Sequence, residues 1–101
     1  MLGKAYGIGV GPGDPKLLTV KALEILAQLK IVFYPSFGKN SIALDIARSH
    51  INPDAKLIEM NIPLSPNEAK VVAYQNFANQ IKEYLNNQVD VGVLCEGDPL
   101  F

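Results

Sequence analysis

Short apolar runs alternate along the chain with stretches in which apolar residues recur every three or four positions. Four runs are mostly apolar and bounded by turn residues, so they predict strands. These runs cover residues 5–10, 31–34, 56–60 and 89–95. The second is expected to stop at Pro35, because proline has no N–H to donate to a neighbouring strand. The last is apolar almost throughout, which is typical of a strand buried on both faces.

The first two periodic stretches predict helices with polar caps. Thr19 can cap the first helix through its hydroxyl. One face of that helix carries Val20, Leu23, Leu26 and Ala27 at helical spacing. The second helix opens at Asn40 or Ser41 and pairs residues four apart, which are Ile42 with Ile46 and Ala43 with Ala47. His50 follows this helix and is interpreted as a residue at its carboxyl end.

The third helix has the clearest start signal. Ser65-Pro66-Asn67-Glu68 combines a cap residue, a proline at the first helical position and a glutamate that completes a capping box. The expected buried stripe is Ala69, Ala73, Phe77, Ile81 and Leu85. Asn86-Asn87 supplies residues that tolerate a left-handed turn at the end. Tyr74, Phe77 and Tyr84 are interpreted as core or interface residues.

Strands and helices thus alternate, which predicts an α/β domain with a mainly parallel sheet, flanking helices and right-handed crossovers. The chain has 101 residues, of which 49% are hydrophobic and 19% charged, enough for one domain with a core. Nine basic and ten acidic residues are scattered without a run of one sign, which argues against a nucleic-acid partner. No apolar stretch approaches the roughly 20 residues of a membrane-spanning helix.

The single cysteine, Cys95, cannot form an internal disulfide, and no signal-peptide pattern opens the chain. A reducing, cytoplasmic location is therefore expected. Cys95 ends an apolar strand without a base beside it in sequence, so we interpret it as a buried small residue rather than a catalytic thiol.

Two glycine- and proline-rich loops, at 11–15 and 96–99, follow the carboxyl ends of predicted strands, where α/β sheets bind ligands. Common nucleotide motifs do not fit them. A dinucleotide loop starting at Gly7 or Gly9 needs its third glycine at position 12 or 14, where the chain has proline and aspartate. A phosphate-binding loop ending in Gly38-Lys39 lacks the glycine required five residues earlier.

Taken together, the two loops resemble those of the tetrapyrrole (corrin/porphyrin) methylases. Residues 7–19, GIGVGPGDPKLLT, are similar to the opening motif of that family, and Gly97-Asp98-Pro99 to its cofactor loop. Residues 94–101, LCEGDPLF, and residues 41–47, SIALDIA, most resemble the branch that methylates precorrin-2 or cobalt-factor II at carbon 20. The uroporphyrinogen-III branch has an aspartate, proposed as a base, where this chain has Pro35, so the resemblance to that branch is weaker.

The resemblance implies the amino-terminal domain of a methyltransferase that uses S-adenosylmethionine on a tetrapyrrole and forms a homodimer. It covers residues 1–101, and because the chain stops within a loop we expect the second domain of the family to be absent from it. The implied cofactor-binding residues are Pro12, Glu96, Gly97, Asp98 and Phe101. The implied substrate-binding residues are Gly11, Gly13 and Asp14. No metal ligand is implied, and no catalytic residue is identified.

Simpler roles stay open for several of these residues. Asp14 and Asp98 are also typical turn or cap residues. The cations that could pair with substrate carboxylates, by charge alone, are Lys16, Lys21, Lys39 and Arg48. The alternatives for the whole chain are a relative acting on another substrate of this family and a non-catalytic α/β binding module.

Overall fold

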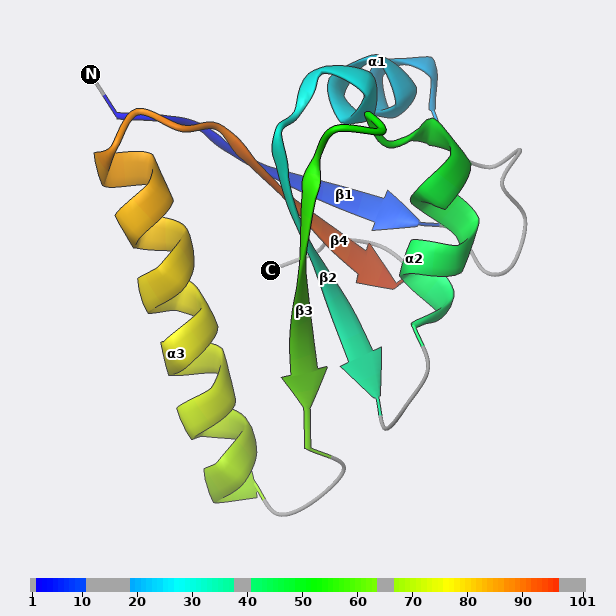
Figure 1. The fold of residues 1–101 in the computed structure, drawn as a ribbon. Coiled ribbons are helices and arrows are strands. Elements are labelled where there is room, and N and C mark those ends of the chain that lie inside the picture. The colour runs from blue at the N-terminus through cyan, green and yellow to red at the C-terminus, as the bar shows by residue number, and fades with distance from the viewer. Residues whose placement is uncertain (1, 11–18, 38–40, 64–66, 97–101) are drawn as a thin grey trace.

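The computed structural model of the chain describes residues 2–10, 19–37, 41–63 and 67–96. It confirms an α/β domain in which strands and helices alternate (Figure 1). The elements are β1 (Ala5–Val10), α1 (Val20–Gln28), β2 (Ile31–Phe37), α2 (Ile42–Ala47), a 3-10 turn (Arg48–His50), β3 (Lys56–Ile62), α3 (Asn67–Asn86) and β4 (Val91–Glu96). The four strands and three α-helices fall at or near the segments that the apolar pattern predicts, and the 3-10 turn is an addition to them.

The four strands form one parallel sheet in the order β1-β4-β2-β3. The last strand of the described chain therefore lies between the first two. β4 pairs with β1 along its whole length, from Ala5 opposite Val91 to Val10 opposite Glu96. The carboxyl ends of β1 and β4 consequently lie side by side.

The sheet opens at its carboxyl edge between β4 and β2. These two strands pair only from Ile31 opposite Val91 to Phe33 opposite Val93. Beyond that point β4 stays with β1, whereas β2 continues with β3 to Phe37 opposite Ile62. In Figure 1 the arrowheads of β1 and β4 point away from those of β2 and β3.

The opening also explains why the predicted end of β2 is wrong. The strand does not stop at Pro35 but runs two residues further, to Phe37, and Pro35 lies opposite Met60 of β3. Past Phe33, β2 pairs with β3 alone and has a free side, which is where sheets tolerate a proline.

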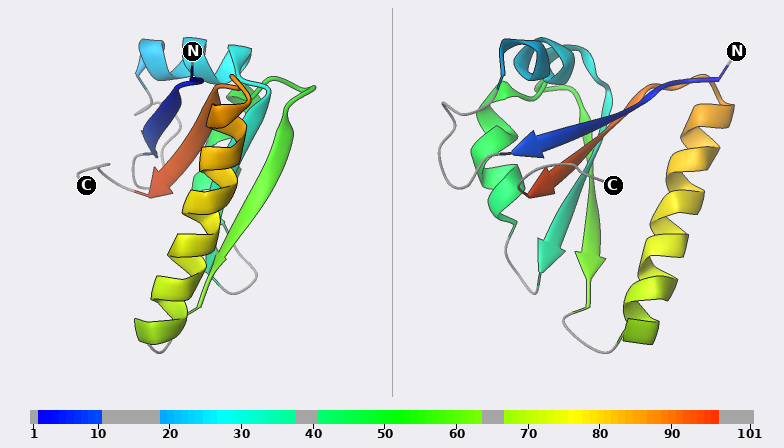
Figure 2. Two further views of the ribbon diagram at one scale, coloured as in Figure 1. Left: turned by 90° about the vertical axis from the view of Figure 1, so that its left-hand side faces the viewer. Right: turned by 180° about the vertical axis from the view of Figure 1, so that it is seen from behind.

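Helices cover both faces of the sheet (Figure 2). On one face, α1 and α2 enclose the larger core, in which Leu26, Val32 and Leu94 are buried. On the other face, α3 packs over a smaller core formed by Phe33, Met60 and Val91. The rings of Phe33 and Tyr84 meet edge to face, with centroids 6.0 Å apart, and join α3 to the sheet.

The caps of the two shorter helices are confirmed. Thr19 Oγ1 accepts a hydrogen bond from Ala22 N at 3.1 Å, and Ser41 Oγ accepts one from Leu44 N at 3.2 Å. Ser41 rather than Asn40 is therefore the cap of α2. The expected apolar face of α1 is partly wrong, because Val20 is 71% exposed and Ala27 is exposed, while Leu26 is buried.

In α3 the expected stripe is half-buried throughout, and Phe77, Ile81 and Leu85 pack against the smaller core. The end of the helix differs from the prediction. The left-handed residue is Gln88, with φ 63°, because the Asn87 N–H still donates to helix carbonyls. The predicted cap at Ser65-Pro66 lies outside the described residues.

Candidate functional site

The carboxyl edge of the sheet brings together the starting points of the two glycine-rich loops. Val10, which ends β1, is the register partner of Glu96, which ends β4. Residues 11–18 and 97–101 follow these two positions and lie outside the described residues. Both loops thus leave from neighbouring strands at the edge where parallel α/β sheets bind their ligands.

An open apolar groove of about 550 Å³ lies at this edge, in the size range of small-molecule sites. Its walls come from the ends of β2, β3 and β4 and from the middle of α3. They consist of Pro35, Met60, Ile62, Tyr74, Phe77, Ala78, Ile81, Val93, Leu94 and Cys95. Val93 packs on the α3 side of the sheet and Leu94 in the core under α1 and α2. The groove therefore occupies the opening where β4 and β2 part.

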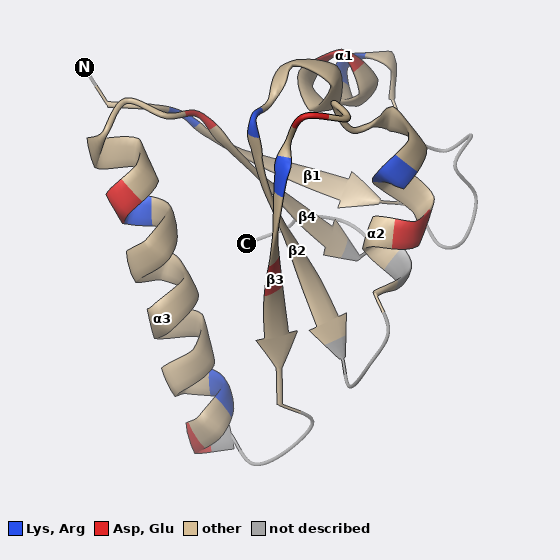
Figure 3. Ribbon diagram, in the orientation of Figure 1, with Lys and Arg blue, Asp and Glu red and all other residues tan. Residues whose placement is uncertain are grey.

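The groove is built for contact with an apolar surface. Among its described lining residues none is charged, and the polar groups are the Tyr74 hydroxyl and the Cys95 thiol. Figure 3 shows charges of both signs spread over the described helices and strands, without a patch of one sign. Tyr74 is 54% exposed, so it stands at the rim of the groove rather than in the core.

Cys95 is half-buried in the groove wall, and its Sγ lies 3.6 Å from the Val93 carbonyl oxygen, to which it donates. Burial raises the pKa of the Cys95 thiol above its ordinary value, because the desolvated site disfavours the thiolate. A nucleophilic cysteine needs the opposite shift. The environment of Cys95 thus agrees with its interpretation as a packing residue.

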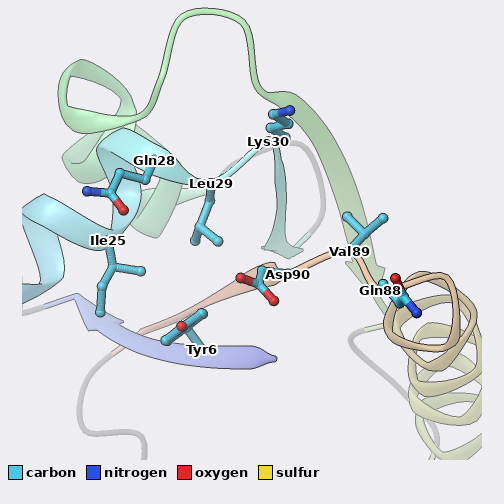
Figure 4. A pocket seen from close by; sticks show the side chains of 8 residues that line it. All are labelled: Tyr6, Ile25, Gln28, Leu29, Lys30, Gln88, Val89 and Asp90. Carbon is cyan, nitrogen blue, oxygen red and sulfur yellow. The ribbon is translucent and has the colours of Figure 1, made fainter. Parts of the chain in front are cut away.

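A second pocket, of about 340 Å³, lies at the opposite, amino end of the strands (Figure 4). Tyr6, Gln28, Lys30, Gln88 and Asp90 supply its polar side chains. The Asp90 carboxylate accepts a hydrogen bond from Lys4 N at 2.7 Å and so fastens the start of β1 beside β4. We assign this pocket to the anchoring of the first strand, since neither glycine-rich loop starts at this end.

Most of the expected ligand-binding residues lie outside the described part of the chain, namely Pro12, Gly97, Asp98 and Phe101 for the cofactor and Gly11, Gly13 and Asp14 for the substrate. Glu96 is placed by its backbone at the end of β4. Of the candidate cations, Lys21 and Arg48 are exposed and neither lines the groove, while Lys16 and Lys39 are not described.

Within the described ranges, no group of three side chains able to hold a metal ion is found. No helix among these residues is long and apolar enough to cross a membrane. His50 is half-buried at the end of the 3-10 turn, as its position after α2 predicts.

Sequence reasoning did not find the wall that α3 contributes to the groove. The signal was present, because Val71, Tyr74 and Ala78 follow one another at helical spacing beside the expected stripe. They widen the apolar face of α3 beyond what the sheet covers. Val71 and Tyr74 remain more than half exposed, and Tyr74 and Ala78 line the groove.

A parallel sheet with helices on both faces and a ligand crevice at its carboxyl edge defines a doubly wound α/β domain. The family model of the Tetrapyrrole (Corrin/Porphyrin) Methylases matches residues 4–101, so the chain belongs to this family. This finding confirms the resemblance carried by the two loops.

Two relatives and one solved structure illustrate the relationship. The chain is 37% identical over 99 residues to the probable cobalt-precorrin-2 C(20)-methyltransferase of Methanocaldococcus jannaschii, covering 95% of this chain and 41% of the relative. It is 33% identical over 94 residues to the cobalt-precorrin-2 C(20)-methyltransferase of Salmonella typhimurium, covering 91% and 38%. The X-ray structure of a cobalt precorrin-4 methyltransferase superposes with a TM-score of 0.63 at 26% identity, covering 95% of this chain and 35% of that one. The chain thus spans about two fifths of the length of these relatives.

Proposed function

We propose that the chain acts in the S-adenosylmethionine-dependent methylation of precorrin-2 or cobalt-factor II at carbon 20, a step of cobalamin biosynthesis. The observation that carries this proposal is the 37% identity, over 95% of the chain, to a protein named for that reaction. The substrate is a proposal because the chain covers 41% of that relative.

S-adenosylmethionine supplies a methyl group on a sulfonium that is already a good leaving group. When bound, it would methylate a nucleophilic ring carbon: the electron pair of the broken carbon–sulfur bond would stay on sulfur in S-adenosylhomocysteine, and the ring would give up one proton. Residues of the chain then have to align the reactants and exclude water, for which orientation contributes on the order of 7–11 kcal/mol. The apolar groove suits this task, since Met60, Phe77 and Ile81 offer a water-excluding wall to a flat macrocycle.

The proposed cofactor residues are Pro12, Glu96, Gly97, Asp98 and Phe101, and the proposed tetrapyrrole residues are Gly11, Gly13 and Asp14. Two facts support placing these residues in one site. The two segments start from the paired residues Val10 and Glu96, and the groove opens beside the end of β4. By the resemblance, we also propose that the protein works as a homodimer. The single cysteine, which cannot form an internal disulfide, supports the further proposal of a reducing, cytoplasmic location.

The test is methyl transfer by the protein to two substrates, metal-free precorrin-2 and cobalt-factor II, followed by mass spectrometry. We expect one of them to gain a methyl group at carbon 20. Calorimetric titration with S-adenosylhomocysteine measures the cofactor site separately. Gly97→Val should abolish this binding while the protein stays folded, because a branched side chain denies the ligand a close approach to the backbone. Unchanged affinity in folded Gly97→Val would remove Gly97 from the cofactor site.

A second candidate is another methylation within the same family, and the similarity to a cobalt precorrin-4 methyltransferase is what favours it. Adding cobalt-precorrin-4 to the assay separates the two candidates. If cobalt-precorrin-4 alone is methylated, it is the substrate, and methylation of precorrin-2 at carbon 20 is ruled out. Binding of S-adenosylhomocysteine without transfer to any tetrapyrrole would instead favour a non-catalytic binding module.

A further inference from the structure

Ser36 is the buried polar side chain of the described core, with 1% of its surface exposed. Its Oγ is shielded from solvent and has no hydrogen-bond partner among the described residues. Buried hydroxyl groups in folded proteins are nearly always paired, because an unpaired one has lost its hydrogen bonds to water without replacement. An alanine would fill the same place in the core without this cost. We therefore expect the Ser36 hydroxyl to have a hydrogen-bond partner that is not part of the described structure.

The place of Ser36 in the sheet indicates where this partner lies. Ser36 is the second-last residue of β2, at the carboxyl edge and beyond the last pair that joins β2 to β4. Counted from that pair, Phe33 opposite Val93, Ser36 stands three residues along β2 and Glu96 three residues along β4. The two positions thus flank the opening of the sheet, and Glu96 begins the segment proposed to hold the methyl donor.

The two faces of the sheet differ in chemistry at this opening. Side chains alternate along β2, so that Phe33 packs under α3 while Val32 and Tyr34 belong to the core under α1 and α2. By the same alternation Ser36 lies on the α1 and α2 side, and Pro35 lines the apolar groove on the α3 side. A flat macrocycle suits the apolar side, whereas a ligand rich in hydroxyl, amino and carboxylate groups suits the side with the free hydroxyl.

We propose that Ser36 is a binding residue for the methyl donor, whose polar groups pair with the Ser36 hydroxyl when the donor occupies the opening between β4 and β2. This inference rests on the proposed function. Rotation about the single side-chain torsion of serine moves Oγ between staggered positions, so the hydroxyl turns toward the ligand without a change in the strand.

The test compares Ser36→Ala with the unchanged protein by thermal unfolding and by calorimetric titration with S-adenosylhomocysteine. Without ligand, Ser36→Ala should unfold at the same temperature or roughly 0–5 °C higher, because it removes an unpaired buried group. With ligand, its dissociation constant should rise about three- to tenfold, the loss of one hydrogen bond. Ser41→Ala is the matched control, since the Ser41 hydroxyl has a partner in Leu44 N. This control should unfold at a lower temperature and bind S-adenosylhomocysteine as before.

Three outcomes would overturn the inference while leaving the proposed function intact. Equal affinity of Ser36→Ala and the unchanged protein means that the hydroxyl does not touch the donor. A lower unfolding temperature of Ser36→Ala means that the hydroxyl is already paired in the free protein. Weaker binding of precorrin-2 with unchanged binding of S-adenosylhomocysteine assigns Ser36 to the macrocycle. Failure of the unchanged protein to bind S-adenosylhomocysteine would overturn the proposed function, and this inference with it.

Discussion

Cys95 is the nucleophilic side chain on the described wall of the groove, and its surroundings decide its chemistry. The thiol is half-buried, it donates to the Val93 carbonyl, and burial raises its pKa. At neutral pH it is therefore a thiol to a greater extent than a free cysteine is. Methyl transfer from a sulfonium to carbon also needs no enzyme nucleophile.

Cys95→Ala should accordingly retain methyl transfer within about tenfold, whereas loss of a true nucleophile would cost several further orders of magnitude. Transfer rates at saturating S-adenosylmethionine provide the measurement. Alkylation of the unchanged protein by iodoacetamide adds an independent check, because a raised pKa predicts slow labelling at neutral pH that accelerates only in alkaline solution. A folded but inactive Cys95→Ala, or rapid labelling at neutral pH, would contradict the packing role.

At the scale of elements, the start of the described chain is held by the end of α3 and the start of β4. Gly3 N donates to the Leu85 carbonyl at 2.9 Å, and Val91 N donates to the Lys4 carbonyl at 2.9 Å. Gly3 needs to be a glycine for this contact, because a Cβ there would overlap the backbone of Val89. Gly7, within β1, is the opposite case, since a Cβ there would meet nothing within 4 Å.

Two substitutions to alanine should therefore have effects of opposite sign on the free energy of unfolding. Gly3→Ala should lower it by about 1–3 kcal/mol, because the backbone of Val89 has to shift to admit a methyl group. Gly7→Ala, the matched control, should raise it by about 0.4–1 kcal/mol through the lower entropy of the unfolded chain. Urea denaturation monitored by circular dichroism measures both. Similar stability of the two variants would mean that the start of the chain is not packed as described.

At the scale of the whole molecule, the helix layers cover the sheet unevenly. α1 and α2 enclose one face, but on the other face α3 packs against Phe33 of β2, Met60 of β3 and Val91 of β4. On that face Ala5 and Gly7 of β1 are exposed. Parallel sheets are normally covered on both faces, so we expect this uncovered surface to bind another molecule.

The protein should therefore self-associate reversibly as its concentration rises, which light scattering over a concentration series measures. Gly7→Lys should reduce this association, because a Cβ at Gly7 meets no atom within 4 Å and the lysine adds a charge to the uncovered part of the sheet. The control is Val20→Lys on α1, which adds the same charge at a position that is 71% exposed and should leave association unchanged. A protein that stays monomeric at all concentrations, or equal effects of the two lysines, would rule out this surface.

The sequence by itself determined the secondary elements and the family. Four strands, three helices and the cap Thr19 follow from apolar spacing and local hydrogen bonding, which involve residues only a few positions apart; the structure chose Ser41 over Asn40 as the cap of α2. Predictions from the same local information were wrong for features that depend on packing. Val20 fits a helical period yet faces solvent, and Pro35 lies inside β2 because that strand has a free side there.

Only the tertiary structure decided the strand order, the opening of the sheet and the composition of the groove. β4 inserts between β1 and β2, although nearly the whole chain separates it from β1, and this pairing sets Val10 and Glu96, where the two glycine-rich loops start, side by side. The residues expected within those loops stay predictions from the resemblance. The unpaired hydroxyl of Ser36 has no signature in sequence, since burial and hydrogen bonding at one position are set by residues distant along the chain.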